Sequence, residues 1–231
     1  MVLSFFQGYS FGFCNSLFSS YVDWFHNFSC SLLFGVLVFV VFIFLYILFN
    51  SFYFKSKIDY HFGEFMCSLF PTLILLFQMF PSLGILYYYG LMNIDSSLTI
   101  KVTGHQWYWN YNYSDIGLCF DSYMKSIDSL LLGEYRLLEV DNRCIVPCDV
   151  NVRFCVTSAD VIHSWSLPCF SIKADAMSGI LSVVNYSFPM VGVFYGQCSE
   201  ICGANHSFMP ICVEVTTVDC FISWIYSMVG F

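Results

Sequence analysis

Two long stretches without a charged side chain occupy the N-terminal part of the sequence. No Asp, Glu, Lys or Arg lies between Asp23 and Lys55, and none lies between Glu64 and Asp95. Each stretch holds about 30 residues, whereas a helix that spans a bilayer needs only about 20. Hydrophobic residues make up 58% of the chain, against roughly 45–50% in ordinary soluble domains. The pattern therefore predicts two membrane-spanning helices in preference to buried core helices.

The predicted helices cover about residues 28–54 and 65–90, and a short connector joins them. A connector of this length allows a hairpin, so both outer ends are expected on the same side of the membrane. No Lys or Arg precedes Lys55 and Lys57 in the connector. The positive-inside tendency places these lysines on the cytoplasmic or matrix-like side. The remainder of the chain is then expected on the opposite side.

Short segments that alternate between apolar and polar residues follow Asp95, and this is the period of a half-buried strand. The expected strands are 98–103, 107–113, 135–140, 149–156, 179–184, 191–195 and 211–216, and a short amphipathic helix is expected at 219–228. No helical segment separates the strands, which predicts an antiparallel sandwich or barrel. The expected architecture is an N-terminal segment and a two-helix transmembrane hairpin in residues 1–94, followed by an all-β domain in residues 95–231.

The expected β domain is acidic. It contains thirteen acidic and six basic residues, a net charge of −7. Such a surface attracts a cationic partner over long range, at a rate that depends on salt. Solubility alone would explain the charge equally well. Nucleic acid is a poor partner, because its phosphates require a basic surface.

One loop concentrates soft metal donors between the last two expected strands. It reads Cys198-Ser-Glu-Ile-Cys202-Gly-Ala-Asn-His206-Ser-Phe-Met209, and a further imidazole, His163, lies upstream. Thiolate, imidazole and thioether donors suit copper better than magnesium or calcium. Two bridging thiolates with two imidazoles, a thioether and a main-chain carbonyl would suit a pair of copper ions. Such a centre transfers electrons.

The residues of this loop also fit a zinc site, a disulfide or simple packing. A zinc site with two cysteines and two histidines is compatible with the cysteine spacing, although it leaves the methionine unexplained. A disulfide between Cys198 and Cys202, or packing alone, would also account for two close cysteines. A second close pair, Cys144 and Cys148, has no histidine nearby and is interpreted as packing.

Two further residues have both a structural and a functional interpretation. Trp107 belongs to the aromatic segment 104–109, which fits core packing, an interfacial belt or a point where electrons enter. Glu64 stands at the start of the second apolar stretch. Acidic residues there serve either as interfacial anchors or in proton paths. The residue types alone do not separate these interpretations.

Five blocks of the sequence together match a known pattern. They are Val102-Thr-Gly-His-Gln-Trp-Tyr-Trp109, Phe120-Asp-Ser-Tyr-Met124, Arg136-Leu-Leu-Glu-Val-Asp-Asn-Arg143, Asp160-Val-Ile-His-Ser-Trp165 and Tyr195-Gly-Gln-Cys-Ser-Glu-Ile-Cys-Gly-Ala-Asn-His-Ser-Phe-Met-Pro210. With these blocks the chain resembles subunit II of the haem–copper cytochrome c oxidases, in its mitochondrial form. The resemblance extends over nearly the whole chain. It implies a two-helix transmembrane hairpin followed by a cupredoxin-like sandwich that carries the dinuclear copper centre CuA.

The resemblance also implies roles for single residues. The implied CuA ligands are His163, Cys198, Cys202, His206, Met209 and the main-chain carbonyl of Glu200. The Glu200 carboxylate matches a ligand of a magnesium ion shared with subunit I. Trp107 matches the residue that takes up electrons from cytochrome c, and Glu64 matches a residue near the mouth of a proton path. The implied docking face for cytochrome c includes Asp121, Asp141 and Asp160.

The implied function is electron input to an oxidase. Electrons from reduced cytochrome c would pass through CuA to haem in subunit I, where haem and CuB reduce oxygen to water with proton pumping. The implied location is the mitochondrial inner membrane, among lipid and other oxidase subunits, with the β domain in the intermembrane space. The docking surface departs from many relatives at Asn112 and in the short segment 114–119. The alternative function is a membrane-anchored metal-binding module without electron transfer.

Overall fold

The computed structural model describes residues 16–52, 59–91 and 95–230. Contacts between residues divide the chain into two compact units. The first contains most of two long helices, from Tyr21 to Tyr88, and the second contains the strands, from Tyr89 onward, together with residues 16–20.

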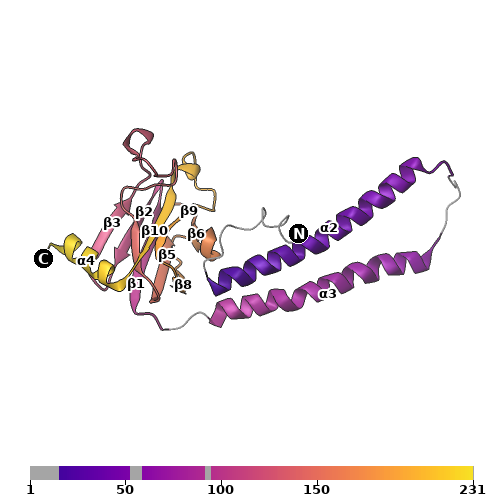
Figure 1. Ribbon diagram of the computed structural model, residues 1–231, viewed down its shortest axis with the longest axis horizontal. Coiled ribbons are helices and arrows are strands. Elements are labelled where there is room, and N and C mark those ends of the chain that lie inside the picture. The colour runs from indigo at the N-terminus through magenta and orange to yellow at the C-terminus, as the bar shows by residue number, and fades with distance from the viewer. Residues whose placement is uncertain (1–15, 53–58, 92–94, 231) are drawn as a thin grey trace. The chain divides into compact units, whose positions relative to one another are not determined.

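Two long helices make up the described part of the first unit (Figure 1). They are α2 (Leu17–Phe49) and α3 (His61–Leu91), and both are long and apolar enough to cross a membrane. The rings of Tyr21 and Tyr88 lie 5.8 Å apart, and those of Phe28 and Phe77 lie 5.7 Å apart. These pairs place the start of one helix beside the end of the other. The predicted helical hairpin is therefore confirmed.

The bounds of α2 differ from the prediction, because the helix covers Leu17–Phe49 instead of about 28–54. The backbone N–H of Ser19 donates to Oγ of Ser16 at 3.1 Å, the bond expected of an N-cap serine. A charge-free stretch shows which part of a helix is apolar, but it does not show where the helix begins or ends. Helix α2 also includes the charged residue Asp23, which lies outside the charge-free stretch. The helix ends earlier than predicted, at Phe49.

Helix α3 begins at His61 instead of about residue 65, so Glu64 lies in its first turn. Pro71 and Pro81 lie inside the helix. Prolines are tolerated in membrane helices where neighbouring groups satisfy the freed backbone carbonyls. The connector lysines, Lys55 and Lys57, lie outside the described residues.

The second unit is a β-sandwich (Figure 1). Its elements are β1 (Leu98–His105), β2 (Tyr108–Tyr113), β3 (Leu118–Ser122), η2 (Ile127–Ser129), β4 (Cys144–Pro147), β5 (Asn151–Ser158), β6 (His163–Leu167), η3 (Pro168–Phe170), β7 (Ile172–Ala176), β8 (Ser182–Ser187), β9 (Gly192–Gln197), η4 (His206–Phe208), β10 (Pro210–Thr216) and α4 (Val218–Val229). One sheet has the order β3-β2-β1-β5-β8, another has the order β4-β10-β9, and β6 pairs with β7. The all-β sandwich and the terminal helix at about 219–228 are confirmed.

The strand directions correct the expected purely antiparallel arrangement. Strands β1 and β5 are parallel, with Ile100 opposite Phe154, and β4 and β10 are parallel as well. The remaining pairs are antiparallel. Alternating side chains show which face of a strand is buried, but they contain no information about the direction of its neighbour. This is why the sequence pattern did not distinguish the two directions.

The expected strand at 135–140 is wrong. This segment forms turns, and its only ladder contact within the described residues is an isolated bridge between Val140 and Met124. Its alternation has a different cause, because Glu139 is buried to accept hydrogen bonds from Nε of Arg143 and from the hydroxyl of Tyr195, both at 2.9 Å. The segment is therefore fixed by a buried carboxylate instead of a strand ladder.

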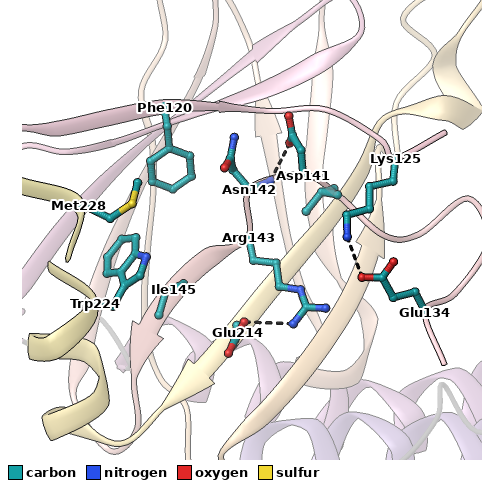
Figure 2. Close-up of a pocket in the computed structure, with 11 residues that line it drawn as sticks. Phe120, Lys125, Glu134, Asp141, Asn142, Arg143, Ile145, Glu214, Trp224 and Met228 are labelled. Atoms are coloured by element: carbon teal, nitrogen blue, oxygen red, sulfur yellow. Dashed lines mark hydrogen bonds and ion pairs between the residues drawn. The ribbon is translucent and has the colours of Figure 1, made fainter. Parts of the chain in front are cut away.

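The same network borders a cavity of about 340 Å³ (Figure 2). Arg143 Nη1 also donates to Glu214 at 3.1 Å, and Lys125 Nζ donates to Glu134 at 2.7 Å. Each charged group in these two pairs faces an opposite charge. The Arg143–Glu214 pair ties the 123–143 segment to β10, and the Lys125–Glu134 pair lies within the segment. The aromatic side of this cavity includes Trp224 from α4.

Large aromatic side chains fill the interior of the sandwich. Trp165 of β6 stacks on Phe154 of β5 with ring centres 4.8 Å apart, and its indole N–H donates to the hydroxyl of Tyr111 at 3.2 Å. All three side chains are fully buried. The indole N–H of Trp165 and the hydroxyl of Tyr111 bond to each other inside the core, so neither group is left unsatisfied. This packing fixes β6, which begins with His163.

Candidate metal centre

A pair of buried thiols lies in the loop between β9 and β10. The Sγ atoms of Cys198 and Cys202 are 4.0 Å apart, and both cysteines are free. A disulfide bond is about 2.05 Å long, so the two sulfurs are not bonded to each other. The structure thus favours a pair of thiols over the disulfide that the sequence left open.

Each thiol faces an imidazole. Nδ1 of His163 lies 3.9 Å from Sγ of Cys198, and Nδ1 of His206 lies 3.5 Å from Sγ of Cys202. Sδ of Met209 lies 3.5 Å from Sγ of Cys202. The thiol of Cys198 also donates to the main-chain carbonyl of Glu200 at 3.3 Å. All six predicted donor residues are therefore gathered at one place.

Hydrogen bonds connect the donor loop to strand β6. The N–H of Ser199 donates to the carbonyl of Ser164 at 3.0 Å, and Oγ of Ser166 donates to the carbonyl of Gln197 at 2.9 Å. These bonds join segments that are more than thirty positions apart in the chain. They hold the cysteine loop beside His163, which is the first residue of β6.

His163 is fully buried, and its ring has little freedom to move. Its Nε2 lies 2.9 Å from Oδ1 of Asp160, and its ring meets Trp109 edge-on at 5.9 Å. A Cβ on Gly104 of β1 would lie only 2.9 Å from Cδ2 of the imidazole. A glycine inside a strand often marks such a close approach. The ring is therefore enclosed on three sides, with Nδ1 directed at the thiols.

The protonation of the cluster follows from its burial and its hydrogen bonds. Burial opposes ionisation of Cys198, but bonds with His163 and with the backbone outweigh it and lower the pKa of this thiol to about 6. Burial and the nearby Cys198 raise the pKa of the Cys202 thiol to about 12. Two adjacent thiolates therefore repel each other in a dry environment. A coordinated cation removes this penalty, because a coordinating thiol is deprotonated outright.

The donor set fits copper better than zinc. His163, Cys198 and Cys202 form a group whose donor atoms all lie within 4.8 Å of one another, the only such group in the described part of the chain. His206 and Met209 extend this group on the Cys202 side. A structural zinc ion takes four donors around one centre and makes no use of a thioether. Soft sulfur donors with imidazoles are typical of copper.

Trp107 lies beside the cluster but contributes no donor atom. A Cβ on Gly203, the residue after Cys202, would lie 3.2 Å from Cζ2 of the indole. The side chain of Trp107 is partly exposed. The predicted point of electron input therefore lies between solvent and the cysteine loop.

The three acidic residues of the predicted docking face are in two places. Asp121 and Asp141 are neighbours, because the side-chain amide of Asn142 donates to the Asp121 carbonyl and its backbone N–H donates to the Asp141 carboxylate. Asp160 instead lies at the metal centre. Its contact with His163 lowers the pKa of its carboxyl against the effect of burial. Sequence reasoning missed this second role of Asp160.

The remaining predicted site residues lie at the surface of their units. The carboxylate-bearing Glu200 is exposed. Glu64 is exposed in the first turn of α3, 3.5 Å from Nδ1 of His61. Sequence reasoning also overlooked Gln106 and Gly104, which contact the donor loop and His163. A glycine within a strand pattern was the available signal for Gly104, whereas no local signal pointed to Gln106.

The fold and the site define a class of protein: a β-sandwich attached to apolar helices and holding a buried thiol, imidazole and thioether centre. The family model described as "Cytochrome C oxidase subunit II, periplasmic domain" matches residues 98–216. The chain belongs to the cytochrome c oxidase subunit II family. It is accordingly one subunit of an oxidoreductase complex, and the predicted family and cupredoxin-like fold are confirmed.

Relatives and solved structures agree with this assignment. The chain is 72% identical over 225 residues to cytochrome c oxidase subunit 2 of Caenorhabditis elegans, covering 96% of this chain and 97% of the relative. It is 73% identical over 223 residues to that of Ascaris suum, covering 96% of each chain. The periplasmic domain of subunit II of cytochrome oxidase from Bradyrhizobium japonicum superposes with a TM-score of 0.55 at 45% identity, covering 58% of this chain and 95% of that domain. Family membership and two membrane-length helices make the chain a mitochondrial membrane protein.

Proposed function

We propose that this chain supplies the electron input of a cytochrome c oxidase. It accepts electrons from reduced cytochrome c at a CuA centre and passes them to haem in subunit I. The observation that carries the proposal is the buried pair of free thiols, 4.0 Å apart, each with its own imidazole. When bound, a copper pair supplies reversible one-electron transfer. No observation favours the alternative of a metal-binding module without electron transfer.

The proposed ligands are His163, Cys198, Cys202, His206, Met209 and the main-chain carbonyl of Glu200. Strand β6 and the 198–209 loop hold these donors rigidly, because hydrogen bonds connect the two segments. The indole N–H of Trp109 donates to the Met209 carbonyl at 3.4 Å and restrains the end of the loop. A rigid donor set favours rapid electron transfer, since the ligands move little between oxidation states.

The proposed route begins at an acidic surface. Asp121 and Asp141 lie near each other and would attract a cationic cytochrome c through long-range electrostatics. Asp160 lies closer to the cluster. Electrons would enter through the Trp107 indole, which lies against Gly203, and leave toward subunit I through the partly exposed His206.

Two carboxylates of this chain have proposed roles that involve subunit I. The exposed Glu200 side chain would ligate magnesium together with subunit I, while its carbonyl faces the thiols. The exposed Glu64 would lie near a proton path of subunit I. We further propose that residues 1–94 comprise an N-terminal segment and the membrane hairpin, which contacts lipid, and that residues 95–231 form the CuA domain. The hairpin would lie in the inner membrane and the CuA domain in the intermembrane space.

The test is an electron paramagnetic resonance spectrum of the full chain loaded with copper. One unpaired electron shared equally by two copper nuclei gives a hyperfine pattern that no mononuclear site produces. Cys198→Ser should abolish this pattern. The matched control is Cys155→Ser, which removes a free thiol of β5 outside the loop. A mononuclear copper signal, or zinc bound without a copper signal, would refute the proposal.

A further inference from the structure

Gln106 connects the turn before β2 to the metal centre at two points. Its side-chain Nε2 donates to the carbonyl of Cys202 at 2.8 Å, across 96 positions of sequence. Its backbone N–H donates to Oδ2 of Asp160, also at 2.8 Å. The other carboxylate oxygen of Asp160 holds His163. One residue thus bonds to a proposed ligand and to the carboxylate that orients another.

The neighbouring Trp107 ring is held against Gly203 in the same place. A Cβ on Gly203 would lie 3.1 Å from Nε2 of Gln106 and 3.2 Å from Cζ2 of Trp107. The φ angle of Gly203 is +125°, a conformation that other residues rarely adopt. The contact between Trp107 and residue 203 therefore requires glycine, because a side chain would crowd the ring and because the backbone has a positive φ angle.

No polar contact of its own holds the Trp107 ring. Its indole N–H is buried and has no hydrogen-bond partner among the described residues. Such a group has lost its hydrogen bond to water, so the indole N–H would gain a partner by turning toward solvent. Its attachment to Gln106 and its packing on Gly203 oppose that movement.

We propose that Gln106 is a positioning residue, whose bonds to Cys202 and Asp160 hold the Trp107 indole against the cysteine loop. The consequence for electron transfer rests on the proposed function, whereas the position of the ring is a property of this chain alone. The side-chain amide must be the donor, because the Cys202 carbonyl only accepts. A carboxylate of the same size therefore cannot replace it.

The position of the ring can be measured without copper or electron transfer. Hydrogen exchange of each indole N–H is followed by nuclear magnetic resonance on the full chain in detergent, with isotope-labelled tryptophan. Gln106→Glu should accelerate exchange of the Trp107 N–H by about fivefold to tenfold, the scale of one hydrogen bond. The buried Trp165 N–H, which donates to Tyr111, is the internal control and should not change.

A second variant separates loss of position from loss of fold. Gln106→Met keeps the length of the side chain and adds no charge, but it has no donor. If Gln106→Glu accelerates hydrogen exchange at the Trp165 N–H as well as at the Trp107 N–H, the fold itself has been loosened. The exchange rates in Gln106→Met then decide whether Gln106 positions the Trp107 ring. Selective acceleration at Trp107 supports the proposal. Unchanged exchange at Trp107 in a folded variant overturns it.

The functional consequence is measured in the assembled oxidase with flash-reduced cytochrome c. Both variants should slow electron input from bound cytochrome c by about tenfold to a hundredfold, as misplaced reaction partners do, with an unchanged copper spectrum and KM. A raised KM at a normal rate would assign Gln106 to partner contact and overturn the positioning role. A displaced ring with a normal rate would leave the positioning role intact and refute the Trp107 route of the proposed function.

Discussion

Asp160 and His163 form a carboxylate–imidazole pair, with Oδ1 and Nε2 2.9 Å apart, while Nδ1 of the same ring faces Cys198. In metal sites such a partner fixes the ring orientation and the tautomer of a ligating histidine. Burial lowers the pKa of His163, but the bonds with Cys198 and with Asp160 outweigh it and raise this pKa above its ordinary value. Asp160 therefore belongs to the support of the metal centre as well as to the acidic surface.

Asp160→Asn should weaken copper binding by about tenfold to a hundredfold, the usual effect of losing such a support, and should alter the copper spectrum. Asp141→Asn is the matched control, because among the described residues this carboxylate accepts only from the backbone N–H groups of Tyr123 and Asn142. The control should weaken cytochrome c binding at low salt only. Copper titration and binding at two ionic strengths measure both effects. An unchanged copper spectrum in Asp160→Asn would show that Asp160 does not support the metal centre.

Trp107→Ala should slow electron input while copper stays bound, because the indole contributes no ligand. Trp107→Phe keeps an aromatic ring against Gly203 and should retain more of the rate. Stopped-flow reduction by cytochrome c, together with the copper spectrum, separates electron input from metal loss. A normal rate in Trp107→Ala would show that electrons enter elsewhere.

Gly104→Ala should displace the His163 ring, since the added Cβ would lie 2.9 Å from Cδ2 and 3.1 Å from Cζ3 of Trp109. The expected results are weaker copper binding and a loss of about 1–3 kcal/mol of stability from overpacking. Gly90→Ala adds the same methyl group where no atom of the described residues lies within 4 Å. Copper affinity and thermal unfolding of the two variants give the comparison. Equal effects would mean that Gly104 does not control the ring.

Glu139→Gln should destabilise the chain by about 3 kcal/mol, the lower end for a broken buried ion pair, because Arg143 keeps Glu214. Glu134→Gln, which breaks the more accessible pair with Lys125, should cost less stability. Urea unfolding followed by tryptophan fluorescence measures both changes. Equal losses would show that the burial of Glu139 adds nothing.

The same carboxylate predicts a pH dependence. Burial raises the pKa of Glu139, but bonds from Arg143 and Tyr195 outweigh it and lower the pKa below its ordinary value. A lowered folded-state pKa adds stability above the unfolded value of about 4.3, and this stability is lost as pH falls through the folded value. The parent chain should therefore lose more stability below about pH 4 than Glu139→Gln does. Parallel pH profiles would contradict this assignment.

Glu64→Gln should slow turnover of the assembled oxidase and leave the copper spectrum unchanged, because the proposed role of Glu64 is in proton uptake. His61→Asn removes the imidazole 3.5 Å from Glu64 and keeps the carboxylate. This control should retain most of the turnover. Steady-state oxygen consumption provides the measurement, and equal rates in Glu64→Gln and the parent chain would reduce Glu64 to an interfacial anchor.

Features encoded by neighbouring residues were predictable. Charge-free stretches longer than a bilayer predicted both helices, because transfer of charge into lipid is costly wherever the helix begins. The donors of the 198–209 loop are close in sequence, so their softness favoured copper, with zinc, a disulfide or packing as the alternatives. His163 lies 35 positions before Cys198; the sequence offered it as a candidate imidazole, and its match to the family pattern assigned it as a ligand.

The tertiary structure decided which segments meet. Packing of the sandwich made β1 and β5 parallel, turned 135–140 into a segment fixed by the buried Glu139, and gave Asp160 a second role. The bond from Gln106 to the Cys202 carbonyl joins residues 96 positions apart. Local periodicity specifies the buried face of each strand, but such long-range bonds depend on how whole strands pack, and no short pattern of residues contains that information.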